Sequence, residues 1–238
     1  MCRFGIILSK KPVNLNLAIK DFSRLSKENP APDGDKQEDG WGVIYNVKNK
    51  GYSVFKSTLP IWEDNSADYF DNVFSTQIFL HSRSATFASQ KNRLDLNQPF
   101  FSKNFIFVFN GRIGGVKMPF KVEGNAGSER ILNLIETFFS IYNNLEKAIL
   151  KTVELLKKHS KKIYGLNFSL FFKETLFTYS YFEEYEDYYK LYYWKKGDFI
   201  VVSSAGGILS KNCFLNSCFR EIPSTSSIPM NKVIKISF

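Results

Sequence analysis

Short apolar runs of strand length, separated by turn residues, recur along most of the chain, and this pattern constrains the fold more than any other feature. One pair of runs flanks the turn at Asn49, Lys50 and Gly51 and predicts a hairpin. The expected strands cover residues 4–9, 41–46, 52–56, 76–83, 104–110, 167–173, 175–182, 188–194, 199–203 and 232–237.

Helical periodicity is clearest in two adjacent segments in the middle of the chain. Ser128 is a candidate N-cap for the first, and the second extends from about residue 145 to residue 159. A looser helical pattern covers residues 16–28. The order of elements along the chain is strands, then paired helices, then further strands. This order predicts one α+β domain over residues 1–238, in which helices cover antiparallel sheets.

Composition excludes several other classes of protein. The chain has 238 residues, of which 44% are hydrophobic and 23% charged, a globular balance rather than a disordered or collagen-like one. Its apolar runs are far shorter than the roughly 20 residues that a membrane-spanning helix needs. The first run ends at Lys10 and Lys11, without the long apolar region and cleavage site of a signal peptide. We therefore expect a cytoplasmic protein that makes no membrane contact.

The net charge of +9 raises the question of nucleic-acid binding. The lysines are scattered, and the densest run, Lys157, Lys158, Lys161 and Lys162, lies at the end of the second predicted helix. Cations there stabilise the helix dipole, so a solvated helix end is the simpler interpretation and a weak anion-binding patch the alternative. The 24 Phe and 12 Tyr lie mainly in predicted strands, which favours core roles over base stacking. Nucleic acid is therefore not an expected partner.

Cysteines and histidines are too few for a disulfide framework or a metal cluster. The chain has three cysteines, Cys2, Cys213 and Cys218, and its two histidines are His81 and His159. Cys213 and Cys218 have no second ligand pair to complete a tetrahedral zinc site. They are either part-buried thiols near a late turn or a redox pair. We expect no metal and no cofactor.

Cys2 follows Met1 directly, and a small residue at this position generally permits removal of the initiator methionine. Cys2 would then carry a free α-amine with a reference pKa of about 7.7 to 8.0, beside a thiol of about 8.5. Such an amine accepts the thiol proton, so one residue supplies both nucleophile and base. A cysteine at position 2 is weak support for this role unless other motifs accompany it.

Five motifs follow Met1-Cys-Arg in a fixed order. They begin at Asp39 (Asp-Gly-Trp-Gly-Val-Ile-Tyr), His81 (His-Ser-Arg-Ser-Ala-Thr), Asn97 (Asn-Gln-Pro-Phe), Phe107 (Phe-Val-Phe-Asn-Gly) and Gly124 (Gly-Asn-Ala-Gly-Ser-Glu). In this order and at this spacing they resemble the class II glutamine amidotransferase domain, which has the N-terminal-nucleophile hydrolase fold. The resemblance implies a four-layer αββα sandwich with the cysteine at the end of a sheet strand.

The resemblance also implies a role for four residues. Cys2 matches the nucleophile, Arg83 the arginine that binds the carboxylate of glutamine, and Asn110 and Gly111 the oxyanion hole. A guanidinium suits a carboxylate, and an amide side chain with a glycine N–H can donate to one developing oxyanion. Without the resemblance, the simpler interpretation of Arg83 is a charged residue at the end of a strand, and that of Asn110-Gly111 is a hairpin turn.

The sequence departs from the family pattern where the family contacts its substrate. The family usually has Thr-Asp in place of Ala126 and Gly127, and that Asp binds the α-ammonium of glutamine. Without this Asp, the binding free energy of the α-ammonium would be weaker by roughly a few kcal/mol. Free glutamine itself is therefore in doubt as the substrate. Glu123 and Glu129 are candidate replacements. Other departures from the family pattern are Gly5, Gln98, Phe109 and Ser204-Ala205-Gly206.

Two functions remain open from the sequence. The first is an amidohydrolase in which Cys2 attacks the side-chain amide of glutamine or of a γ-glutamyl amide, and water then completes the cycle. Released ammonia would go free or pass to a separate partner subunit. The second is a domain that has lost turnover and binds a ligand or a partner protein, an alternative that the glycine at position 127 favours.

Overall fold

The computed structural model describes residues 1–102, 105–205 and 227–238. Its strands form two antiparallel sheets. The six-stranded sheet has the order β3 (Gly51–Ser57), β2 (Trp41–Val47), β4 (Phe74–Ser82), β1 (Arg3–Asn14), β10 (Phe199–Ser203) and β9 (Tyr192–Lys196). The five-stranded sheet has the order β11 (Val233–Ser237), β8 (Thr175–Tyr179), β7 (Lys162–Phe172), β6 (Ile106–Gly114) and β5 (Phe100–Phe101).

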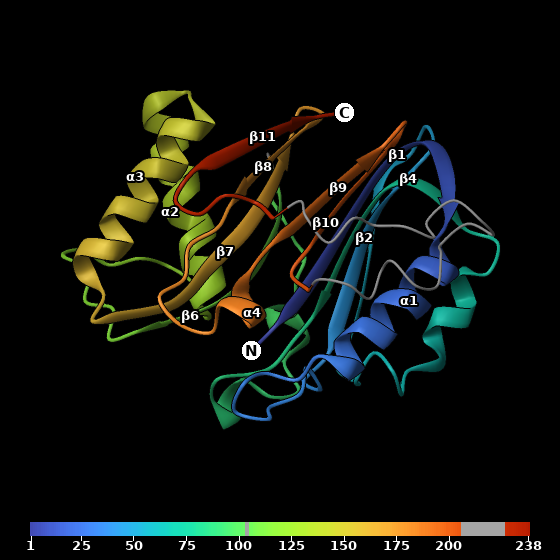
Figure 1. The fold of residues 1–238 in the computed structure, drawn as a ribbon, viewed down its shortest axis with the longest axis horizontal. Helices are drawn as coiled ribbons and strands as arrows, with labels where there is room; N and C mark the ends of the chain where they lie inside the picture. Colours follow the sequence, from blue (N-terminus) through green and yellow to red (C-terminus); the bar gives the residue numbers. More distant parts are fainter. Residues whose placement is uncertain (103–104, 206–226) are drawn as a thin grey trace.

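Helices cover the outer face of each sheet (Figure 1). Helix α1 (Leu15–Glu28) packs on the six-stranded sheet, and α2 (Gly127–Tyr142) and α3 (Leu145–His159) pack on the five-stranded one. The expected four-layer αββα sandwich is therefore confirmed. The shorter helical segments are α4 (Glu186–Tyr189), η1 (Asn65–Phe70), η2 (Ala88–Gln90) and η3 (Leu94–Leu96).

Strand β1 shows how the sequence builds these layers. Phe4, Ile6 and Leu8 belong to the core between the two sheets, whereas Ile7 belongs to the core under α1. This alternation is the two-residue period of a strand that is buried on both faces. The rings of Phe79 and a phenylalanine of β7, 5.3 Å apart, join the two sheets across the central core.

Strand β1 extends five residues beyond its expected end, to Asn14, and β7 starts five residues early, at Lys162. Two further differences concern how an element begins. Helix α2 begins at Gly127 with Ala126 as its N-cap, so the prediction of Ser128 as the cap was wrong. The Glu129 carboxylate instead accepts the N–H groups of Asn125 and Ala126, and this replaces a capping hydroxyl.

The second difference concerns the expected strand over residues 188–194. Tyr185 has a left-handed backbone (φ 55°) that turns the chain into α4, which contains Tyr188 and Tyr189. The strand β9 starts only at Tyr192. The run of aromatic residues therefore extends over both a short helix and a strand, and for this reason the expected strand began too early.

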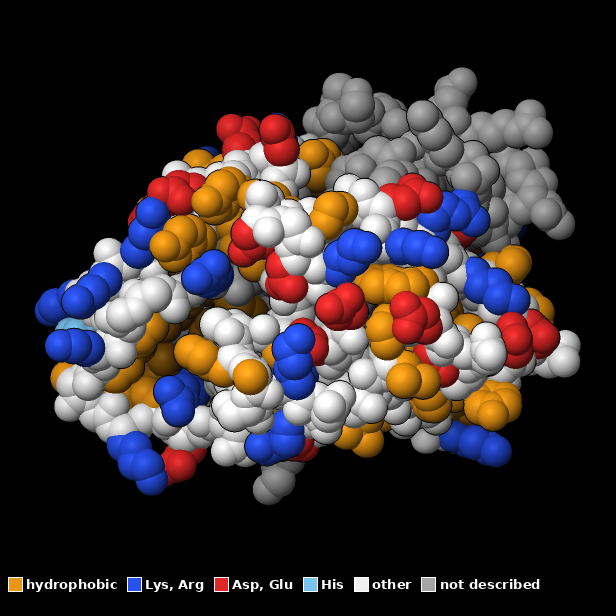
Figure 2. Space-filling view, turned by 90° about the horizontal axis from the view of Figure 1, so that it is seen from below, with side chains coloured by type: hydrophobic (Ala, Val, Ile, Leu, Met, Phe, Trp, Pro, Cys, Tyr) orange, Lys and Arg blue, Asp and Glu red, His pale blue; other side chains and the backbone are white. Residues whose placement is uncertain are grey.

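Charge is mixed rather than gathered on the face that Figure 2 shows. Figure 2 shows, from the lower side of Figure 1, basic and acidic side chains interspersed over the visible face. In the basic run at the end of α3, Lys157 Nζ lies 2.9 Å from Asn231 Oδ1 and 3.4 Å from the centroid of the Tyr181 ring. Lys157 and Lys158 lie in the last turn of α3, which agrees with the interpretation of the run as a helix end. Among the helices in the described ranges, none is long and apolar enough to cross a membrane.

Candidate active site

Strand β1 positions Cys2 beside the segment that follows β4. The pairing of Arg3 with Ser82 sets the register, and the half-buried Cys2 thiol lies 3.7 Å from the carbonyl oxygen of Ser84. Arg83 stands between these two serines. The sequence-predicted nucleophile and the predicted carboxylate-binding arginine are therefore brought together at one end of the six-stranded sheet.

Arg3 anchors this end of β1 from the buried side. Its Nη1 donates to the carbonyl of Tyr188 at 2.8 Å and to that of Ser204, and the guanidinium stacks 3.7 Å from the Tyr188 ring centroid. Burial lowers its pKa. The backbone of Phe4 is held in turn by the Ser204 hydroxyl, at 2.8 Å. These contacts fix the position of Arg3, the residue that follows Cys2 in the chain.

The guanidinium of Arg83 is buried and held by neighbouring loops. Its Nη2 donates to the carbonyl of Gln90 at 2.7 Å, and Nη1 lies 3.4 Å from both the Asp39 carbonyl and Asn97 Oδ1. Burial lowers the pKa of Arg83, and the nearby Cys2 thiol partly offsets this effect. Since a guanidinium has five N–H donors, these three acceptors leave donor capacity for a carboxylate.

Asn110 carries the most informative feature of the site. It lies inside β6, so the hairpin-turn interpretation is excluded, and it is 0% exposed. Neither Nδ2 nor Oδ1 has a hydrogen-bond partner among the described residues. Its neighbour in the register, Asn167, has partners on both amide atoms: it donates to the Tyr189 carbonyl at 2.6 Å and accepts from the Ser180 hydroxyl at 2.9 Å.

An unpartnered buried amide lowers the free energy of unfolding by about 1–3 kcal/mol, so a role outside stability is expected for the amide of Asn110.

Packing explains why residue 111, next to Asn110, is a glycine. A Cβ at this position would lie 2.3 Å from the Gly165 carbonyl oxygen and 2.6 Å from Phe109 Cζ. Close approach of β6 and β7 therefore requires glycine here, whatever its N–H does.

His81 joins the two sheets beside Asn110. Its Nε2 lies 3.2 Å from the carbonyl oxygen of Phe109, and Gln98 Oε1 accepts the N–H of Phe109 at 2.7 Å. Complete burial lowers the pKa of His81 to about 3, so the ring is neutral at pH 7. Since the Phe109 carbonyl can only accept, we assign the ring proton to Nε2. The sequence contained His81 in a motif but gave no reason to assign it this linking position.

Both acids considered as replacements for the missing Asp have other partners. The Glu129 carboxylate caps α2, and exposed Glu123 forms an ion pair with Lys121 at 2.7 Å. A Cβ added to Gly127 would have no atom within 4 Å. Position 127 thus has space for a longer side chain but offers no carboxylate.

Asp35 is a site residue that sequence reasoning missed. It accepts the Met1 ammonium at 2.8 Å and the Ser84 hydroxyl. Desolvation alone would raise the pKa of Asp35, but these two hydrogen bonds lower it below its usual range. The residue lies in the loop before β2, where Asp and Gly are ordinary turn residues, so no local signal distinguished it.

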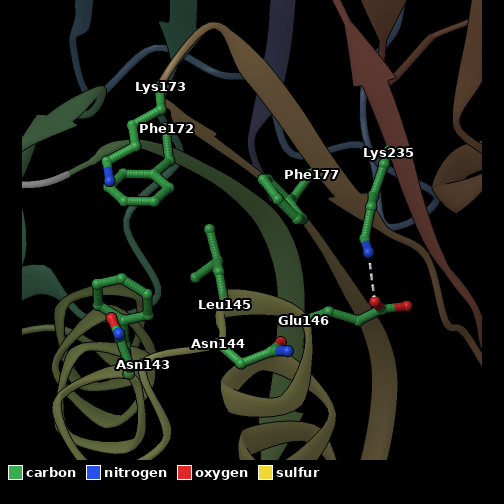
Figure 3. Close-up of a pocket in the computed structure, with 9 residues that line it drawn as sticks. Asn143, Asn144, Leu145, Glu146, Phe172, Lys173, Phe177 and Lys235 are labelled. Atoms are coloured by element: carbon green, nitrogen blue, oxygen red, sulfur yellow. Dashed lines mark ion pairs between the residues drawn. The ribbon is translucent and has the colours of Figure 1, made fainter.

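A separate pocket of about 310 Å³ lies away from these residues (Figure 3). Its apolar wall includes Phe172 and Phe177, and an ion pair of Lys235 with Glu146 at 2.5 Å lies at one side. Phe172 is five residues further along β7 than Asn167, which faces Asn110. The pocket therefore does not belong to the site around Cys2. Cys213, Cys218 and Gly206 lie outside the described residues.

No family model matches the sequence, and neither does any curated protein. Solved structures match the fold. One is a glutamine aminotransferase class-II domain protein from Silicibacter pomeroyi, with a TM-score of 0.56 and 15% identity over 85% of this chain and 88% of that one.

Another is the glutamine phosphoribosylpyrophosphate amidotransferase of B. subtilis, complexed with ADP and GMP, with a TM-score of 0.58 and 16% identity. The match covers 86% of this chain but 42% of the amidotransferase chain, so this protein spans less than half of that relative. The chain therefore has the fold of the class II glutamine amidotransferase domains, the sandwich of the N-terminal-nucleophile hydrolases.

Proposed function

We propose that this protein is an amidohydrolase that uses Cys2 to cleave the side-chain amide of glutamine or of a γ-glutamyl amide. The observation that carries the proposal is the fully buried amide of Asn110, which has no hydrogen-bond partner in the described part of the chain. It lies close to the His81 and Arg83 segment that adjoins Cys2. A buried donor without a partner is suited to a negative charge that develops only during the reaction.

The first step requires a free α-amine at Cys2. While Met1 is attached, the nitrogen of Cys2 is a peptide amide and cannot act as a base. After removal of Met1, the amine takes the thiol proton, and the thiolate attacks the amide carbon to form a C–S bond. Asn110 Nδ2 and the Gly111 N–H would stabilise the resulting oxyanion.

Collapse of this intermediate breaks the C–N bond and leaves a thioester. The α-ammonium gives its proton to the leaving nitrogen, which departs as ammonia or an amine. Water, deprotonated by the same amine, then hydrolyses the thioester and restores the thiol. Ammonia would go free or pass to a separate acceptor subunit, and the reaction would take place in the cytoplasm in a single domain of residues 1–238.

Arg83 would bind the carboxylate of the acyl part. Because Gly127 supplies no acid and both neighbouring glutamates have other partners, the α-nitrogen of the substrate has no carboxylate at this position. This supports γ-glutamyl amides with a neutral α-nitrogen as substrates at least as good as glutamine. It also supports the second candidate function, a domain without turnover that binds a ligand or partner.

Substitution of the nucleophile separates these two functions. We expect Cys2→Ala to abolish release of ammonia or amine from every amide while leaving the thermal midpoint nearly unchanged, since the half-buried thiol makes only a long hydrogen bond, of 3.7 Å, to the described residues. The measurement is amide hydrolysis by protein that begins at residue 2. Full activity of Cys2→Ala would refute the proposed mechanism, and absence of turnover in the native protein would favour the binding function.

A further inference from the structure

Met1 is held in an apolar cage beside Cys2. Its side chain is 7% exposed, and the Tyr189 hydroxyl donates to the thioether sulfur. At the other end of the residue, the ammonium is bound by Asp35 at 2.8 Å. Met1 packs against the buried cluster of Ala31, Tyr188 and Tyr189. Tyr164 and Phe182 pack against the same cluster, and these five residues are here called the cage.

The cage is built by the fold rather than by Met1. The ring of Tyr189 lies directly over Gly165 of β7, where a Cβ would meet the ring at 2.4 Å. Asn167 fixes the same tyrosine through its carbonyl at 2.6 Å, and Tyr188 is fixed through its carbonyl by Arg3. Because these contacts do not involve Met1, we expect Tyr188 and Tyr189 to keep their positions when Met1 is removed.

The place of the cage relative to the reacting atoms follows from covalent geometry. The carbonyl carbon of Met1 is bonded to the nitrogen of Cys2. In the proposed reaction the same nitrogen protonates the leaving nitrogen of the substrate, which must lie within about 3 Å of it. A substituent on the leaving nitrogen therefore begins close to the point where Met1 now begins.

We propose that this cage, once Met1 has been removed, binds an apolar substituent on the leaving amine. The inference rests on the proposed function and narrows its substrate class to γ-glutamyl amides of alkyl or aryl primary amines. In such a reaction the C–N bond breaks, the C–S bond to Cys2 forms, and the α-ammonium supplies the proton that the amine takes away. Glutamine, whose leaving group is ammonia, leaves the cage unused.

The test compares leaving groups on one acyl part. The protein, prepared with Cys2 as its first residue, is assayed with L-glutamine, γ-L-glutamyl methylamide and γ-L-glutamyl n-butylamide. The butyl chain has as many non-hydrogen atoms as the methionine side chain. We expect kcat/KM for the butylamide to exceed that for the methylamide and for glutamine by about tenfold or more, the selectivity typical of an apolar pocket.

Two variants locate the effect. Ala31→Leu fills the space beside Tyr188 and Tyr189, and Phe182→Ala removes a ring that packs against the same cluster. Each is expected to reduce the ratio of butylamide to glutamine kcat/KM by about tenfold. Phe177→Ala is the matched control, since Phe177 is also part-buried but lines the remote pocket of Figure 3. It should leave the ratio unchanged. If Ala31→Leu does not fold, Phe182→Ala still gives the answer.

The outcomes separate this inference from the proposed function. Hydrolysis of glutamine with no advantage for the butylamide, or an advantage that survives both cage variants, would overturn the inference and leave the amidohydrolase in place. No hydrolysis of any of the three amides would overturn both.

Discussion

Two asparagines that face each other across β6 and β7 are expected to have opposite roles. Asn110 makes no hydrogen bond within the described chain, whereas Asn167 holds the carbonyl of Tyr189 and accepts from Ser180. We therefore expect Asn110→Ala to lower kcat by about 10² to 10³ with little loss of affinity or stability.

Asn167→Ala is the control, because it leaves buried groups without partners and should lower the free energy of unfolding by about 1–3 kcal/mol. Steady-state kinetics and urea unfolding of both variants check the pair. An Asn110→Ala enzyme that loses only affinity would contradict the role of its amide as an oxyanion donor.

Gly127 permits a direct test of substrate recognition. A side chain at this position meets no atom within 4 Å of its Cβ, so Gly127→Asp should fold. We expect it to shift discrimination towards glutamine, relative to N-acetylglutamine, by about 1.5–3 kcal/mol, the range for hydrogen bonds to charged groups. Gly127→Asn, of the same size but neutral, should produce a much smaller shift. A native enzyme that already strongly prefers free glutamine would show that another acid binds the ammonium.

Only some residues of the site could be predicted from the sequence. Cys2, Arg83, Asn110 and Gly111 were found because their motifs resemble a known domain. Asp35 was missed, since its partners, the N-terminus and Ser84, are distant in sequence and no local pattern joins them. The same holds for the cage around Met1, whose walls come from segments more than 130 residues apart.

At the scale of elements, two glycines of β6 provide a matched pair. A Cβ at Gly111 would overlap the Gly165 carbonyl at 2.3 Å, whereas the nearest atom to a Cβ at Gly114 is 3.8 Å away. We expect Gly111→Ala to force β6 and β7 apart and to lower the free energy of unfolding by about 1–3 kcal/mol. Gly114→Ala should be nearly neutral. Equal unfolding midpoints for the two variants in urea would show that the strands do not require this close approach.

Most elements were predictable because their periodicity is local. The amphipathic stripe of α3 and the alternating residues of β1 each appear within about ten residues. The failures occurred where a single residue, rather than a periodic pattern, decides where an element begins. The start of α2 depends on a glutamate that replaces the usual cap, and α4 depends on a left-handed tyrosine that propensity disfavours.

At the scale of the whole molecule, His81 links the two sheets and couples their stability to pH. Burial lowers its pKa from 6.5 to about 3, so the unfolded chain binds the extra proton first as pH falls. The contribution of neutral His81 to the free energy of unfolding is therefore fully present above about pH 6.5 and decreases towards pH 3. The decrease between pH 7 and pH 5 is about 2 kcal/mol.

Urea unfolding of the native protein and His81→Gln at pH 7 and pH 5 checks this expectation. The difference between the two proteins cancels contributions from other groups, such as Asp21, whose pKa burial raises to about 6. We expect the native protein to lose about 2 kcal/mol more than the variant over this interval. Equal losses would mean that His81 is not buried in its neutral form between the sheets.

Cys2, with its own α-amine free, is the proposed nucleophile, and every step of the reaction depends on it. Intact mass spectrometry of the purified protein, before and after treatment with a diazoketone analogue of glutamine, tests this role most directly. We expect a protein that lacks Met1 and gains one adduct, which peptide mapping assigns to Cys2 and Cys2→Ala abolishes. Hydrolytically active protein that retains Met1, or an adduct on another residue, would contradict it.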